Sequence, residues 1–128
     1  MASSEFAGQV AVITGGAGGI GLAVATEIAK RGGAVCLVDL KAAELQTGKA
    51  SLEGAVPANA GVMTHACDVG SPEATAAAVQ AVLGRFRRID VLVQAAGITG
   101  ITNTPTENVD PANFDLVMKI NVKGIFLM

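Results

Sequence analysis

Aromatic residues are scarce in this chain, which has no tryptophan, no tyrosine and four phenylalanines among its 128 residues. Apolar residues nonetheless make up 51% of it, so the interior must consist of Ala, Val, Ile and Leu rather than of rings. Helices packed on a buried parallel sheet have such an interior. At this length we expect a single domain, residues 1–128, with a core of its own.

Long apolar runs and basic clusters are also missing. No run approaches the ~20 apolar residues of a transmembrane helix, and residues 1–5 carry no basic start of a signal peptide. We expect residues 1–8 to form a frayed leader. The net charge is −2, and no block of basic residues is visible. We therefore expect neither a membrane nor a nucleic acid as a partner.

Residues that bind metals or form disulfides are few. Cys36 and Cys67 fall in two separate predicted strands and form no close pair, which is typical of buried free thiols in a reducing compartment. The one histidine, His65, also lies in a predicted strand. We predict no metal site and a cytoplasmic location.

Strand and helix patterns alternate four times along the chain. The predicted strands cover 10–14, 35–38, 62–67 and 89–93, and the predicted helices cover 22–31, 42–52, 72–86 and 112–128. Ser71 and Asp110 are predicted N-caps, each followed by proline at the first helical position. This alternation predicts a Rossmann-like, doubly wound parallel α/β sheet with strand order 3-2-1-4 and helices on both faces.

The last predicted helix carries an apolar stripe at helical spacing, which we expect to face the core. Its members are Phe114, Val117, Met118, Val122 and Ile125. Asn121 lies within this stripe, and a polar side chain there needs a hydrogen-bonding partner. Either a functional role or a purely structural one satisfies this requirement.

A glycine-rich turn joins the first predicted strand to the first helix. Phosphate groups bind backbone N–H groups at a helix N-terminus, and a Cβ atom there would hold them off. The glycines match three dinucleotide-binding patterns: Gly16-x-Gly18-x-x-Gly21, Gly15-x-x-Gly18-x-x-Gly21 and Gly15-x-x-x-Gly19-x-Gly21. Their spacing alone does not choose among the three.

An acidic residue, Asp39, closes the second predicted strand. It follows the last glycine by roughly 20 residues, as expected for a carboxylate that binds the adenosine ribose. Such a carboxylate repels a 2′-phosphate, so we predict NAD rather than NADP as the cofactor. Lys41 is a nearby cation that favours the phosphate, and a helix-capping role is the alternative for Asp39.

Four motifs in order resemble the short-chain dehydrogenase/reductase family over essentially the whole chain. They are Thr14-Gly15-x-x-x-Gly19-x-Gly21, Asp68-Val69, Gln94-Ala95-Ala96-Gly97 and Ile120-Asn121-Val122-Lys123-Gly124. The resemblance implies that Asn121 is catalytic. It further implies a cofactor-binding set of Thr14, Gly15, Gly19, Ile20, Gly21, Asp39, Asp68, Val69, Ala96 and Gly97.

The chain departs from the family pattern in two ways. Gln94 and Ala95 stand where the family has two asparagines. The family's catalytic Ser and Tyr-x-x-x-Lys follow the segment of the last helix, and this chain has no tyrosine. The resemblance therefore implies an N-terminal, cofactor-binding portion that is inactive alone.

In the complete enzyme, the resemblance implies hydride transfer between a secondary alcohol or ketone and a nicotinamide, by a dimer or tetramer. The alternatives are a non-catalytic dinucleotide-binding module and a methyltransferase that uses the same glycine turn.

Overall fold

The computed structural model describes residues 4–128, so the first three residues of the expected frayed leader lie outside the described residues. For the rest of that leader the prediction is wrong. The Phe6 N–H donates to the Arg31 carbonyl at 3.0 Å, and the Phe6 side chain packs against the core. This contact secures the chain just before the first strand.

Four parallel strands form a single sheet in the order β3-β2-β1-β4, as the sequence predicts. The elements in chain order are β1 (Val10–Thr14), α1 (Gly19–Lys30), β2 (Ala34–Asp39), α2 (Ala42–Glu53), β3 (Val62–Ala66), α3 (Pro72–Phe86) and β4 (Val91–Gln94). Helix α1 begins earlier than predicted, because two glycines of the turn belong to its first helical turn.

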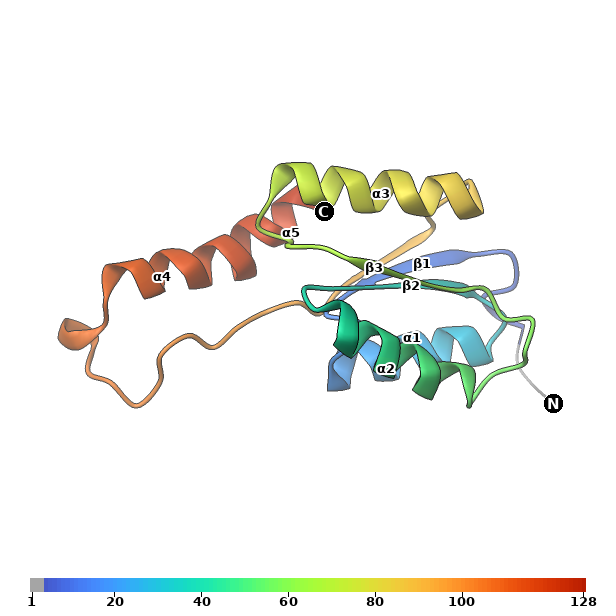
Figure 1. Ribbon diagram of the computed structural model, residues 1–128, viewed down its shortest axis with the longest axis horizontal. Coiled ribbons are helices and arrows are strands. Elements are labelled where there is room, and N and C mark those ends of the chain that lie inside the picture. Colours follow the sequence, from blue (N-terminus) through green and yellow to red (C-terminus); the bar gives the residue numbers. More distant parts are fainter. Residues whose placement is uncertain (1–3) are drawn as a thin grey trace.

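The helices cover both faces of this sheet, with α1 and α2 on one side and α3 on the other (Figure 1). Side chains of successive strand residues point to opposite faces. Ile13 and Leu37 therefore join the cluster under α1 and α2, whereas Val12 and Cys36 join the cluster under α3. Both clusters are mainly aliphatic, as the composition predicts. Cys67 lies just after β3 rather than within it, and both cysteines are buried and free.

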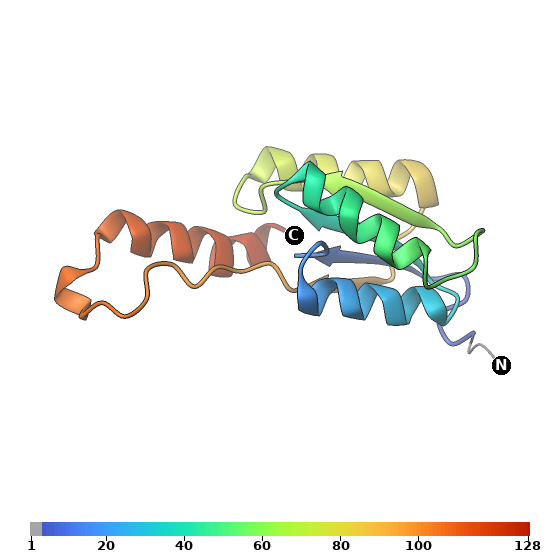
Figure 2. The ribbon, with the colours of Figure 1, turned by 60° about the horizontal axis from the view of Figure 1, so that its bottom comes forward.

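After β4 the chain leaves the sheet as an arm, residues 98–128, which extends past the carboxyl ends of the strands (Figures 1 and 2). It contains a long loop with a 3-10 turn η1 (Thr106–Asn108), then α4 (Pro111–Met118), the π-helical segment η2 (Lys119–Lys123) and α5 (Gly124–Leu127). The predicted N-caps are confirmed. Ser71 Oγ accepts from the Ala74 N–H at 3.2 Å, and Asp110 Oδ1 accepts from the Ala112 N–H at 2.9 Å.

Most of the apolar stripe expected to face the core is exposed instead, and only Val117 among its members is partly buried. Phe114 is 60% exposed and Val122 is 54% exposed. The helix predicted over 112–128 is interrupted by η2, whose wider turns shift the positions that share a face. In addition, α4 lies beyond the sheet rather than over it (Figure 2). No helix among residues 4–128 is long and apolar enough to cross a membrane.

Candidate functional site: a cavity at the carboxyl ends of the strands

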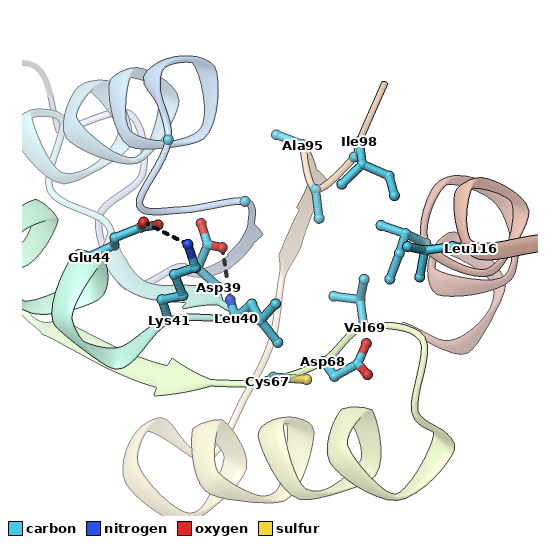
Figure 3. Close-up of a pocket in the computed structure, with 15 residues that line it drawn as sticks. Asp39, Leu40, Lys41, Glu44, Cys67, Asp68, Val69, Ala95, Ile98 and Leu116 are labelled. Carbon is cyan, nitrogen blue, oxygen red and sulfur yellow. Dashed lines mark hydrogen bonds and ion pairs between the residues drawn. The ribbon is translucent and has the colours of Figure 1, made fainter. Parts of the chain in front are cut away.

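A cavity of about 440 Å³ lies where the carboxyl ends of the strands meet the arm (Figure 3). In open parallel sheets, ligands bind at this end, where the strand order reverses. The cavity is lined by Gly15, Gly18, Asp39, Leu40, Lys41, Glu44, Cys67, Asp68, Val69, Ala95, Ala96, Gly97, Ile98, Leu116 and Ile120.

The glycines of the turn are required for different reasons. Gly15 has φ +66°, and a Cβ there would lie 2.7 Å from the Ala95 carbonyl. A Cβ on Gly21 would overlap the Gly15 carbonyl. A Cβ on Gly19, by contrast, would meet no other part of the described chain within 4 Å, its chain neighbours and the backbone of its own helix aside. Internal packing therefore requires Gly15 and Gly21, whereas any requirement at Gly19 must come from a bound molecule.

The amino end of α1 also lacks a cap from the protein itself. Its N-cap residue, Gly18, has no side chain, and the first turn contains no acidic residue. In contrast, the side chains of Ser71 and Asp110 cap α3 and α4. Uncapped N–H groups at a helix N-terminus favour an anion such as a pyrophosphate.

Asp39 connects the end of β2 to the glycine turn. Its Oδ2 accepts from the Ala17 N–H at 3.1 Å, and its Oδ1 accepts from the Leu40 N–H at 2.8 Å. Each carboxylate oxygen keeps a second lone pair for a ligand hydroxyl. Lys41 is the N-cap of α2, and no side chain caps that helix. The helix-capping alternative for Asp39 is therefore wrong.

The Asp68-Val69 pair, which follows β3, forms another wall of the cavity (Figure 3). Asp68 Oδ1 accepts from the Gly70 N–H at 2.9 Å. Val69 is 7% exposed. Cys67 precedes them, and burial raises the pKa of its thiol, with the Asp68 charge as a smaller cause. The thiol is therefore protonated near neutral pH.

Thr14 lies beneath the end of β4. Its side chain is buried, and its Oγ1 accepts from the Ala96 N–H at 3.3 Å. The Thr14 carbonyl accepts from the Ala95 N–H at 3.1 Å. On the β4 side, these hydrogen bonds involve only backbone N–H groups. They therefore form even though Gln94 and Ala95 stand where the family has two asparagines.

Asn121 joins the helical part of the arm to the arm's first residue, Ile98, through both polar groups of its side-chain amide. Its Oδ1 accepts from the Ile98 N–H at 2.9 Å, and its Nδ2 donates to the Ile98 carbonyl at 2.8 Å. The predicted need for a hydrogen-bonding partner is thus met by a loop backbone. Asn121 does not line the cavity, but Ile98 does.

The structure brings together six of the eleven site residues that the sequence predicts. Those lining the cavity are Gly15, Asp39, Asp68, Val69, Ala96 and Gly97. Of the others, Thr14 and Gly21 are buried below, whereas Ile20 is 78% exposed on α1. Sequence reasoning missed Leu40 and Glu44. Leu40 could have been found from the sequence, because it is an apolar residue directly after a predicted strand. In the structure its side chain is 63% exposed and lines the cavity.

A parallel sheet of this order with a cavity at its carboxyl edge defines a Rossmann-like α/β protein. The family model described as short chain dehydrogenase matches residues 9–128. Levodione reductase of Leifsonia aquatica is 39% identical over 125 residues, which cover 98% of this chain and 46% of that protein. The crystal structure of levodione reductase matches with a TM-score of 0.91, over 96% of this chain and 47% of that one.

Cofactor complexes of both kinds are found among similar solved structures. NAD⁺-bound xylitol dehydrogenase is 34% identical with a TM-score of 0.89, and it is matched over 96% of this chain and 46% of that one. A metagenomic short-chain oxidoreductase in complex with NADP is also 34% identical, with a TM-score of 0.86, over 98% of this chain and 54% of that one.

The chain belongs to the short-chain dehydrogenase family of oxidoreductases, which use nicotinamide dinucleotides. This membership excludes the methyltransferase alternative. The chain spans about half the length of curated relatives such as levodione reductase.

Proposed function

We propose that this chain is the cofactor-binding portion of an NAD-dependent short-chain dehydrogenase. The complete enzyme would transfer hydride between a secondary alcohol or ketone and the nicotinamide. The observation that carries the proposal is the Asp39 carboxylate, which lines the cavity beside the glycine turn. A carboxylate there accepts hydrogen bonds from ribose hydroxyls and repels a 2′-phosphate, so NAD is favoured over NADP.

The residues present suit a dinucleotide. The open space above Gly19 and the uncapped end of α1 leave room for a pyrophosphate. Asp68 and Val69 would then hold the adenine, and the Ala96-Gly97 backbone would border the nicotinamide side. When bound, the nicotinamide supplies the hydride donor or acceptor.

Asn121 was expected to be catalytic, and its contacts support a role exerted through another residue. It bonds both backbone groups of Ile98, which lines the cavity. We propose that Asn121 positions this wall of the site, so that its effect on the reaction passes through Ile98.

A non-catalytic dinucleotide-binding module is the second candidate. In either case we expect the 128-residue chain to bind NADH without oxidising alcohols. The coding sequence after residue 128 separates the two. A downstream Ser and Tyr-x-x-x-Lys supports the enzyme, and a stop codon supports the module.

The test of the cofactor proposal is a fluorescence titration with NADH and NADPH. We expect the wild type to bind NADH more tightly. Asp39→Asn should weaken NADH binding about tenfold or more, because a charged hydrogen bond is lost, and should favour NADPH in relative terms. Asp115→Asn, an exposed substitution on α4 outside this cavity, is the control. Tighter wild-type binding of NADPH would contradict the proposal.

The proposed location is the cytoplasm, supported by two buried cysteines that remain free thiols. The proposed assembly is a dimer or tetramer. Exposed apolar side chains on the arm, Phe114 and Phe126 among them, support it. Light scattering of the purified chain tests the assembly.

A further inference from the structure

Charge around the cavity is unevenly distributed. Its lining contains three acidic residues, Asp39, Glu44 and Asp68, and a single basic residue, Lys41. Lys41 follows Asp39 by two positions, so it is the cation best placed to attract a 2′-phosphate on the adenosine ribose. By itself, it would oppose the preference that Asp39 creates.

Lys41 is paired with another cavity residue. It is the N-cap of α2 with an extended backbone, and Glu44 lies in the first turn of that helix. The Lys41 Nζ lies 3.6 Å from Glu44 Oε1, and Figure 3 shows the ammonium group turned toward this carboxylate. Both side chains are more than half exposed.

We propose that Glu44 is a specificity-determining residue that excludes 2′-phosphorylated dinucleotides. It holds the Lys41 ammonium by an ion pair and adds its own negative charge to the cavity. This inference rests on the proposed function and deepens it, because it gives the NAD preference a second determinant besides Asp39.

The physical reason is the charge of the phosphate. A 2′-phosphate carries between about −1.5 and −2 charges near neutral pH. Without Glu44, the ammonium of Lys41 is free to approach that charge, and one source of repulsion disappears. Because both residues are exposed, water and salt screen the interaction. The expected effect is therefore modest, about fivefold in affinity.

The test is Glu44→Gln, which keeps the size of the side chain and removes its charge. NADH and NADPH differ only in the 2′-phosphate, so the ratio of their dissociation constants by fluorescence titration isolates its contribution. We expect this ratio to move about fivefold toward NADPH at low salt, and less at high salt.

The chain offers a matched control on the same helix. Glu53 is also about half exposed and also paired to a lysine, with Lys49 Nζ at 3.7 Å, but it does not line the cavity. Glu53→Gln removes the same charge from α2, and we expect it to leave the NADH to NADPH ratio unchanged. Equal ratios for the two variants would overturn the proposal.

A double variant isolates the role of Lys41. If Glu44 acts partly by holding the ammonium, then Glu44→Gln together with Lys41→Gln should lose part of the gain in NADPH affinity. Retention of the full gain without Lys41 would overturn the ion-pair part of the proposal. A wild type that binds neither dinucleotide, or prefers NADPH, overturns the proposed function itself. A wild type that prefers NADH and is insensitive to Glu44→Gln overturns this inference alone.

Discussion

The sheet body, residues 10–94, and the arm, residues 98–128, are stabilised in different ways. In the body, every residue of β1 is buried, and helices cover both faces of the sheet. Among the described residues of the arm, Gly124 alone is buried, and Phe126 is 84% exposed. The body therefore depends on apolar burial, which is non-directional, whereas the arm needs specific contacts to fix its position.

Those specific contacts are few and identifiable. Asn121 binds both backbone groups of Ile98, and Asn113 Oδ1 accepts from the Ile101 N–H at 2.9 Å. Gly124 approaches so closely that a Cβ would lie 2.9 Å from Val69 Cγ2. The cavity thus has one wall formed by strand ends and a second formed by the arm. Two asparagines hold the arm together internally, and the arm contacts the body where Gly124 packs against Val69 and Met128 packs against the cluster under α3.

The largest expected effect comes from emptying the core of the body. Leu37 is fully buried in β2, and Leu37→Ala should lower the free energy of unfolding by about 2–5 kcal/mol. Phe114→Ala removes a larger side chain from the arm, yet it should cost about 0.5 kcal/mol or less, because Phe114 is exposed. Urea denaturation measures both. Similar losses for the two variants would mean that the arm is packed as the body is.

An intermediate effect is expected at the contact that holds the two ends of the arm together. Asn121→Ala removes two exposed hydrogen bonds to the Ile98 backbone, which water can partly replace, so it should cost about 0.5–1.5 kcal/mol of local stability. Amide hydrogen exchange should therefore speed up at Ile98 and remain slow at Leu37 in the body. Asn121→Asp is the matched variant, since it keeps an acceptor for the N–H and loses the donor to the carbonyl. Unchanged exchange at Ile98 in both variants would show that other contacts hold the loop at Ile98.

The body was predictable from the sequence because its signals are local. The β-branched run at 10–14 and the glycines after it predict β1 and the turn to α1, and Ser71 marks the start of α3. The alternation of strands and helices then limits the topology to few choices, so the order 3-2-1-4 followed. The same logic placed Asp39 and Asp68 at one edge of the sheet.

The arm could not be predicted in the same way. Periodicity assigned Phe114 and Val122 to a buried face, but periodicity reports a shared face and not what covers it. The π-helical segment around Asn121 leaves no comparable mark in the sequence. Within the site, the Lys41–Glu44 pair was missed because its spacing is that of an ordinary ion pair on a helix surface. Only the structure shows that a cavity lies beside it.

The smallest expected effect is a difference between the body and the arm in how their stability depends on pH. Asp90 joins the starts of β1 and β4, since its carboxylate accepts from the Val10 N–H at 2.8 Å and from Arg88 Nη2 at 2.6 Å. The hydrogen bond from Arg88, and next the one from Val10, hold the pKa of Asp90 below its usual value. A lowered folded-state pKa stabilises the protein above the unfolded-state pKa, and this stability is lost as pH falls through the folded-state value.

Urea midpoints measured from about pH 6 down to about pH 2.5 should therefore fall less steeply for Asp90→Asn than for the wild type. The difference should be small, because Arg88 is exposed and its charge is screened. The asparagines that hold the arm together internally do not titrate, so exchange at Ile98 should show no separate acid transition before the body unfolds. An Ile98 transition at higher pH than that of the body would mean that an ionisable group also holds the arm.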